Sequence, residues 1–342
     1  MHILVTGGCG FIGSNFIAHV LQADPESTVC NVDKLTYAGN LANFAAVERD
    51  YSERYSFERA DIADAEAMRR VFKSRSIDAV VNFAAESHVD RSITDADPFI
   101  HSNVKGVQTL LSVALELSIQ RFVHVSTDEV YGSLSLDDVS KGFTEQSPLA
   151  PNSPYAASKA SGDLLCRAWH ETYGFPVVIT RCSNNYGPHQ FPEKLIPFMY
   201  SRAMRDEPLP VYGDGQNVRD WIHVDDHCHG IRLALMQGKA GTVYNFGGNA
   251  ERNNVQVVRE ILNFCGKPES LIRFVKDRPG HDRRYAMDYS FAQKELGFTP
   301  SRNFEEGLRD TLIWYRDNQD WMANITSGAY LSFMRDWYGE RL

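Results

Sequence analysis

The sequence predicts an α/β protein in which a doubly wound parallel sheet is joined to a smaller, mixed α/β lobe. Short apolar stretches typical of buried strands alternate with helical stretches as far as residue 182. Polar residues follow several of these strands directly, as expected for a ligand site at the carboxyl edge of a parallel sheet. We therefore assign residues 1–182 to one domain, to which 223–247 returns, and residues 183–222 and 248–342 to the lobe.

The composition is that of a globular protein and narrows the range of partners. Of the 342 residues, 43% are hydrophobic and 23% are charged, and the net charge is −9. This charge argues against a nucleic acid or an anionic membrane as partner. The six cysteines form no Cys-x-x-Cys pair, which favours reduced thiols. Since no apolar run approaches the ~18 residues of a membrane span and no secretory signal precedes the first strand, we expect a cytoplasmic protein.

The N-terminal strand Ile3–Thr6 leads into three glycines, Gly7, Gly10 and Gly13, and then into a helix that ends near Leu21. Glycines allow the backbone to approach a pyrophosphate closely, and the helix N-terminus offers unpaired N–H groups to it. A tight structural turn is the alternative, but the strand before and the helix after the glycines favour a nucleotide site. This part of the chain therefore predicts a Rossmann-like domain.

The second strand, Val29–Val32, ends at Asp33, about 20 residues after the glycines, where an acid is expected to bind the adenosine ribose. Its charge would repel the 2′-phosphate of NADP, so we favour NAD, although the neighbouring Lys34 leaves NADP open. Tyr55–Ala60 is a possible third strand. Asp61, which follows it, either contacts the cofactor or caps the next helix.

Two adjacent acids end the strand Arg121–Val125, in the order Ser126, Thr127, Asp128, Glu129. One protonated and one ionised carboxyl at the edge of a sheet can act as a general acid and a general base. A solvated strand end that caps the next helix is the simpler alternative.

A tyrosine and a lysine, Tyr155 and Lys159, lie one turn apart at the start of a helix that extends to about Tyr173. An ammonium group beside a phenol favours the phenolate, so we expect Lys159 to lower the pKa of Tyr155 and make it a base.

Within the lobe, four arginines are candidates for a diphosphate clamp, or for pairing with neighbouring acids: Arg219, Arg278, Arg283 and Arg284.

His223 and His227 have a spacing that metal ligands can have. We expect no metal there, because they span the end of the strand Trp221–Val224 and a helix capped by Asp225 or Asp226.

We expect that strand and a second one, Thr242–Phe246, to return to the first domain. Near the end of the chain, the apolar segment Tyr330–Trp337 is expected to dock the C-terminus.

The glycines and the tyrosine–lysine pair are shared by a large superfamily. Three further motifs are specific to a smaller family, namely Lys34–Asn40, Ser126–Gly132 and Asp277–Asp282. With these, the chain resembles, almost from end to end, the NAD-dependent nucleotide-sugar 4,6-dehydratases of the dTDP-glucose 4,6-dehydratase type. These enzymes belong to the extended short-chain dehydrogenase/reductases. Related sugar 4-epimerases usually lack the Asp-Glu pair.

The resemblance implies a mechanism. Tyr155 takes the C4 hydroxyl proton while the C4 hydride passes to NAD, Thr127 holds the C4 oxygen, and Lys159 holds the ribose. Glu129 then removes the C5 proton, Asp128 protonates the leaving C6 hydroxyl, and the hydride returns to C6. Adjacent side chains on a strand face opposite sides, so the chain must leave strand geometry at Thr127 for both acids to reach the sugar.

The resemblance also implies the binding residues. NAD, tightly bound and regenerated in each turnover, would contact Gly7, Gly10, Phe11, Ile12, Gly13, Asp33, Lys34, Leu35, Thr36, Asp61, Ile62, Phe83, Ala84, Ala85, Ser87, Ser102, Tyr155, Lys159 and Asn185. The nucleotide-diphosphate sugar, with dTDP-glucose favoured, would contact Ser87, Thr127, Asn184, Lys194, Leu195, Pro210, Val211, Tyr212, Arg219, Asn254, Asp277, Arg278 and His281. A homodimer is implied, with the helices 103–117 and 155–173 as candidates for its interface.

Three alternatives stay open on the sequence alone. The first is a nucleotide-sugar 4-epimerase or decarboxylase on the same scaffold, which needs no C5 base or C6 acid. The second is a dehydratase for another nucleotide sugar, because the base is not fixed. The third, less favoured, is a non-catalytic NAD-binding protein.

Overall fold

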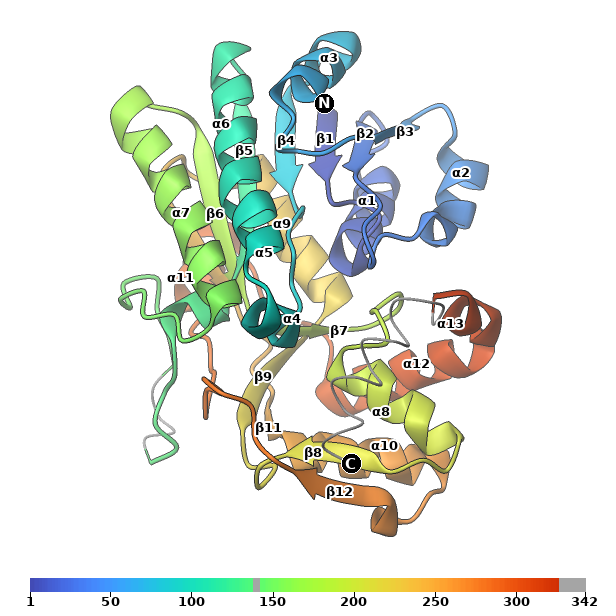
Figure 1. The fold of residues 1–342 in the computed structure, drawn as a ribbon. Helices are drawn as coiled ribbons and strands as arrows, with labels where there is room; N and C mark the ends of the chain where they lie inside the picture. The colour runs from blue at the N-terminus through green and yellow to red at the C-terminus, as the bar shows by residue number, and fades with distance from the viewer. Residues whose placement is uncertain (138–141, 326–342) are drawn as a thin grey trace.

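The computed structural model describes residues 1–137 and 142–325, and its centre is a sheet of seven parallel strands (Figure 1). The strand order is β10-β6-β5-β4-β1-β2-β3, so the direction of winding reverses between β1 and β4. The strands are β1 His2–Thr6, β2 Thr28–Asp33, β3 Tyr55–Arg59, β4 Ala79–Asn82, β5 Arg121–Thr127, β6 Val177–Cys182 and β10 Val243–Phe246. The predicted fold class is confirmed.

Helices cover both faces of this sheet, because its strands carry apolar side chains on both sides. One apolar core joins the sheet to α1 Phe11–Ala23, α2 Ala45–Tyr51, α9 Val224–Gln237 and α11 Ser290–Leu296. A second core joins it to α3 Ala65–Arg75, α6 Val107–Glu116 and α7 Pro154–Tyr173. No helix among the described residues is long and apolar enough to cross a membrane.

The lobe lies beyond the carboxyl ends of the strands (Figure 1) and has an apolar core of its own. It contains a three-stranded sheet in the order β11-β9-β7 and a parallel pair, β12-β8. Its elements are β7 Asn184–Tyr186, α8 Leu195–Met204, β8 Leu209–Tyr212, β9 Val218–His223, β11 Glu251–Asn253, α10 Asn254–Cys265, β12 Ile272–Val275, α12 Phe304–Asp317 and α13 Gln319–Ile325. Two short helices, α4 Val89–Thr94 and α5 Asp97–Phe99, lie between β4 and α6 in the chain.

Two expectations about single elements are wrong. The strand near Trp221 does not return to the main sheet, because β9 pairs with β7 and β11, whereas β10 does return, beside β6. His223, not Asp225 or Asp226, caps α9, its Nδ1 accepting the N–H of Asp225 at 3.2 Å. The helix expected over 103–117 is present; it begins as a π-helix, Ile100–Gly106, and continues as α6 to Glu116. The predicted docking segment 330–337 lies outside the described residues.

Candidate active site

A cavity of about 300 Å³ opens at the carboxyl ends of the central strands, between the sheet and the lobe. All five predicted catalytic residues line it, as do all the predicted cofactor residues except Leu35. The cavity also contains the point where the strand order reverses, between β1 and β4, which is where ligands bind in open α/β sheets.

The glycine turn after β1 forms a cradle that larger residues would fill. Gly7 has a φ of +68°, and a Cβ atom on it would lie 2.5 Å from the backbone nitrogen of Ala84. A Cβ on Gly13 would lie 2.6 Å from the carbonyl oxygen of Gly7. Among the described residues no side chain caps the N-terminus of α1, whose first residues line the cavity. These features fit the pyrophosphate of a dinucleotide.

The residues after β2 favour NAD over NADP. The carboxylate of Asp33 accepts the backbone N–H groups of Cys9 at 2.9 Å and Leu35 at 2.7 Å, which fixes it at the strand end. The ammonium of Lys34, which left NADP open, is bound to the Asp61 carboxylate at 2.7 Å. Lys34 is therefore already paired, and an acid at the end of the second strand is the residue type that favours NAD over NADP.

The chain leaves strand geometry at Thr127, as the mechanism requires. Strand β5 ends there, and Asp128–Tyr131 form a 3-10 turn whose first N–H, from Glu129, is accepted by the Thr127 hydroxyl at 3.3 Å. The same hydroxyl donates to Oδ1 of Asp128 at 3.1 Å. The turn places both acids on the cavity wall, so this prediction is confirmed.

The two acids differ in their surroundings. Burial raises the pKa of Asp128 well above its ordinary value, the charge of Glu129 adds to this shift, and its Oδ2 has no hydrogen-bond partner among the described residues. Burial also raises the pKa of Glu129, but three cations oppose the shift, in the order Arg278, Arg219 and Lys194. Asp128 therefore favours its protonated form, and Glu129 is the better base of the two.

The tyrosine–lysine pair lies at the start of α7, where Ser153 caps the helix and Pro154 occupies its first turn. The expected low pKa of Tyr155 is wrong for the protein without cofactor or substrate. Burial raises the pKa of Tyr155 well above its ordinary value, and the Glu129 charge adds to this. Lys159 instead donates from Nζ to the carbonyl oxygen of Val125 at 2.8 Å. Deprotonation of this phenol therefore needs further positive charge beside it.

Two of the four lobe arginines face the acids, and two do not. Arg283 pairs with Asp214 at 3.1 Å and Arg284 pairs with Glu251 at 2.7 Å, so the alternative of pairing with neighbouring acids holds for these. The charges of Arg219 and Arg278, in contrast, act on the acid pair. Arg219 is 5% exposed and lies over the ring of Tyr285, 4.3 Å from its centre.

The comparisons with known proteins agree with this geometry. The sequence model for GDP-mannose 4,6 dehydratase matches residues 4–311. A dTDP-glucose 4,6-dehydratase from an Actinoplanes species is 52% identical over 326 residues, which are 94% of this chain and 99% of that one. The chain belongs to the nucleotide-sugar 4,6-dehydratase family. A dTDP-glucose 4,6-dehydratase from Salmonella typhimurium is 46% identical to it over 363 aligned residues, 100% of both chains.

Solved structures separate this family from the epimerases. The dTDP-glucose 4,6-dehydratase DesIV from Streptomyces venezuelae, solved with NAD bound, has a TM-score of 0.91 and 50% identity, covering 95% of this chain and 100% of that one. A UDP-glucuronic acid 4-epimerase from Bacillus cereus, also solved with NAD, has a TM-score of 0.85 but 28% identity, over 93% and 99%. The fold is thus shared with epimerases, whereas the sequence is closer to the dehydratase.

Not every residue that the family resemblance implied for the substrate lies on the cavity. Ser87, Thr127, Asn184 and Lys194 do. The remainder lie in the lobe away from its lining: Leu195, Pro210, Val211, Tyr212, Arg219, Asn254, Asp277, Arg278 and His281. Leu35 is also off the lining; its φ of +57° turns the chain so that its N–H reaches Asp33.

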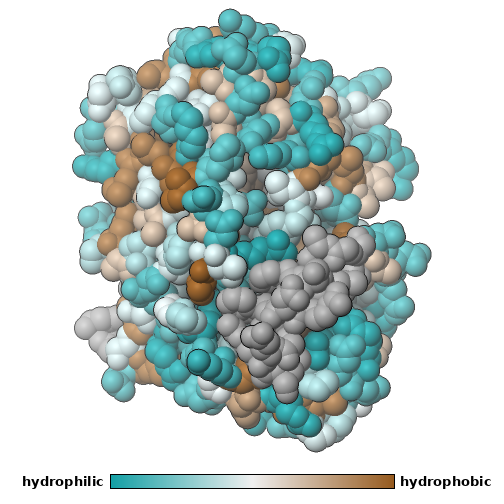
Figure 2. Space-filling view, in the orientation of Figure 1, coloured by the Kyte–Doolittle hydropathy of each residue, from teal (hydrophilic) through white to brown (hydrophobic). Residues whose placement is uncertain are grey.

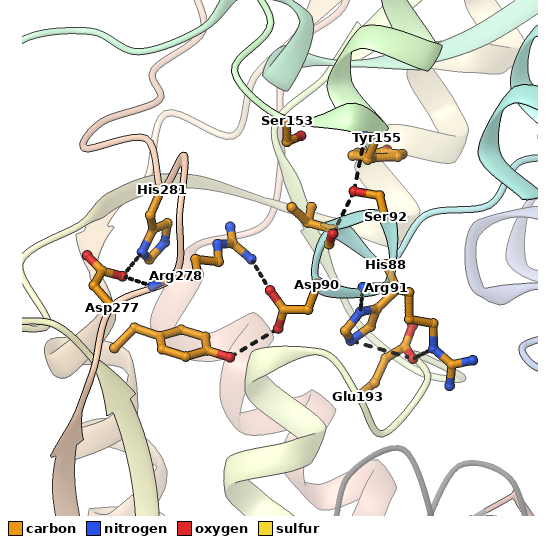
Figure 3. Close-up of polar contacts among 12 residues, drawn as sticks. His88, Asp90, Arg91, Ser92, Ser153, Tyr155, Glu193, Asp277, Arg278 and His281 are labelled. Carbon is orange, nitrogen blue, oxygen red and sulfur yellow. Dashed lines mark hydrogen bonds and ion pairs between the residues drawn. The ribbon is translucent and has the colours of Figure 1, made fainter. Parts of the chain in front are cut away.

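Sequence reasoning missed Glu193, which lies on the cavity wall and beside His88 and Arg91 (Figure 3). Burial raises its pKa to about 7. The phenol of Tyr37 donates to its Oε1 at 3.0 Å, and His88 and Arg91 lie 3.7 and 3.8 Å from its Oε2. The available signal was an acid next to the predicted Lys194 in an otherwise apolar stretch. Cys182, Ser183, Gln190 and Phe191 were also missed.

The histidines near α9 have structural contacts. His223 caps the helix, and Nδ1 of His227 lies 2.9 Å from Oδ1 of Asn185. Among residues 1–137 and 142–325, no group of three or more His, Cys, Asp or Glu side chains is arranged to hold a metal. These contacts support a structural role for His223 and His227, as a helix cap and as a hydrogen-bond partner of Asn185.

Proposed function

We propose that the protein is a dTDP-glucose 4,6-dehydratase, which removes water across C5 and C6 of the sugar and leaves a 4-keto-6-deoxy product. One observation carries the proposal. Asp128 and Glu129, which an epimerase does not need, both lie on the cavity wall together with Tyr155. Relatives of that name align over nearly the whole chain.

The first step takes place at C4. NAD, when bound, supplies the hydride acceptor and later returns the hydride to C6. In our proposal Tyr155 accepts the proton of the C4 hydroxyl, and the hydroxyl of Thr127 fixes the C4 oxygen. Because Lys159 is buried and bound to the Val125 carbonyl, its charge is held beneath the site, where it orients the ribose.

The second step removes water. A C4 ketone acidifies the C5 hydrogen, and Glu129, with three cations near it, is suited to remove that proton. Asp128, whose surroundings favour the protonated form, is suited to give a proton to the C6 hydroxyl as it leaves. In this proposal Glu129 is therefore the base and Asp128 the acid, because of their different surroundings.

The remaining assignments are part of the same proposal. The cofactor residues hold NAD from the glycine cradle to Asn185, and the substrate residues of the lobe hold the nucleotide diphosphate. We include a cytoplasmic location and a homodimer formed through the helices 103–117 and 155–173. An apolar area lies over α6 and α7 on the left flank of Figure 2, and Leu164 of α7 is 55% exposed.

A product assay tests the proposal. The purified protein is incubated with dTDP-glucose and no added reductant, and the loss of one water is followed by mass together with the alkali-induced absorbance of the keto sugar. We expect steady formation of the 4-keto-6-deoxy sugar with no net consumption of NAD. Activity only with UDP, CDP or GDP sugars would change the nucleotide assignment. A C4 epimer without loss of mass would replace the dehydratase by an epimerase.

A further inference from the structure

Helix α4 lies between the sheet and the lobe, and its side chains reach both sides (Figures 1 and 3). Ser92 accepts the backbone N–H of Tyr155 at 3.1 Å. Asp90, two residues before it, faces the lobe instead and is only 3% exposed. A buried carboxylate is costly unless it is paired, so its partners indicate what it does.

The partners of Asp90 come from two separate segments of the lobe. Its Oδ1 accepts from Nη1 of Arg278 at 3.3 Å, and its Oδ2 accepts from the hydroxyl of Tyr212 at 3.1 Å. Tyr212 ends β8, whereas Arg278 lies in the loop that follows β12. One carboxylate on the sheet side therefore fixes two lobe side chains relative to the catalytic turn.

Asp90 binds one nitrogen of the Arg278 guanidinium and leaves another without a hydrogen bond within the described part of the chain. Its buried Nε has no hydrogen-bond partner among the described residues. Burial would lower the pKa of Arg278, but Asp90 and then Glu129 outweigh this and raise it. The guanidinium thus has two anions near it, and one N–H that none of the described residues accepts.

We propose that Asp90 is a positioning residue, which holds Arg278 and Tyr212 in place to bind the diphosphate of the nucleotide sugar. This inference rests on the proposed function, because that function assigns both side chains to the substrate. Without the Asp90 charge, Glu129 is the remaining anion that attracts Arg278, and the guanidinium is drawn away from the diphosphate.

The variant Asp90→Asn tests this role, because it removes the charge but keeps the shape and an acceptor for Tyr212. We expect the KM for dTDP-glucose to rise about tenfold, since hydrogen bonds to charged groups contribute this much or more. The kcat should change by less than about threefold, and the bound NAD per chain should stay the same. Asp97→Asn, an exposed aspartate nearby, is the matched control.

A double-variant cycle distinguishes positioning from general damage. The dissociation constant of dTDP is measured for the wild type, Asp90→Asn, Arg278→Gln and the double variant. If Asp90 acts through Arg278, the first substitution weakens dTDP binding about tenfold alone but less than about twofold in the Arg278→Gln background. Binding of thymidine, which lacks phosphates, should not change. Fully additive effects, or a fall in kcat with KM unchanged, would overturn the proposal.

The outcomes also separate this inference from the proposed function. If the wild type binds dTDP but does not convert dTDP-glucose, the function fails and the binding cycle still decides the role of Asp90. If the wild type converts dTDP-glucose and Asp90→Asn has an unchanged KM, only the positioning role is wrong. If Asp90→Asn does not fold, Tyr212→Phe is measured instead, because it removes the hydrogen bond from the Tyr212 hydroxyl to Asp90. We expect the KM of this variant for dTDP-glucose to rise a few-fold. An unchanged KM contradicts the proposal.

Discussion

The two ends of the cavity are built in different ways. At the cofactor end, Gly7, Gly10, Gly13 and Asp33 lie close together in the sequence and act mainly through backbone shape and N–H groups. At the sugar end, the decisive contacts join side chains far apart in the chain, such as Asp90 and Arg278, which are 188 positions apart. A local sequence motif thus forms the cofactor end. The sugar end depends on buried charges that only the tertiary structure brings together.

The largest expected effect comes from the acids at the sugar end. In the double variant Asp128→Asn, Glu129→Gln, we expect dehydration to fall at least about 10³-fold, because each acid–base group contributes 10²–10⁴. Oxidation at C4 should persist in part, visible as reduced NAD on mixing with dTDP-glucose. NAD content should equal that of the wild type, since the cofactor end is unchanged. Dehydration that survives both changes would show that the roles of the acids are wrong.

A second variant tests the backbone character of the cofactor end. Gly7→Ala places a Cβ 2.5 Å from the nitrogen of Ala84 at a positive φ, so we expect a loss of about 3 kcal/mol in unfolding free energy and purification without NAD. Gly266→Ala is the control, because Gly266 has a φ of +65° but a Cβ on it would meet no other part of the described structure within 4 Å. It should cost only about 1 kcal/mol. Equal losses in urea unfolding would mean that close approach does not matter.

A third prediction uses Glu193, the buried acid on the cavity wall. Burial raises the pKa of Glu193 from 4.5 to about 7, so in this pH range the folded protein keeps a proton that the unfolded chain releases. The contribution of Glu193 to the unfolding free energy therefore falls as pH rises through this window. Glu193→Gln removes the effect, and its stability relative to wild type should rise by about 3 kcal/mol between pH 4.5 and 7. The exposed Glu53→Gln should show no such trend.

The smallest effect is expected where the two ends meet, at Ser92. Ser92→Ala removes the acceptor for the N–H of Tyr155, and we expect a loss of about 1 kcal/mol in stability, as for a helix cap. The kcat should fall a few-fold with KM unchanged, the reverse of the pattern expected for Asp90→Asn. Steady-state kinetics of both variants check this contrast. If Ser92→Ala instead raises KM, the two residues of α4 do not serve separate ends of the cavity.

The sequence by itself determined the cofactor end, the fold class and the catalytic residues on the cavity wall. Glycines after a strand, an acid at the next strand end, and Thr127–Glu129 at a third are local patterns whose geometry the backbone sets. Even the turn at Thr127 could be predicted, because two adjacent acids cannot face one site from a straight strand.

Only the tertiary structure decided which charges meet. Residue spacing does not show that Arg283 and Arg284 pair with Asp214 and Glu251 while Arg278 turns to Asp90. It could not give the direction of the Tyr155 pKa either, because burial and the charge of the nearby Glu129 raise it. Burial and long-range pairing depend on elements packed from distant parts of the chain, and desolvation of those charges sets their chemistry.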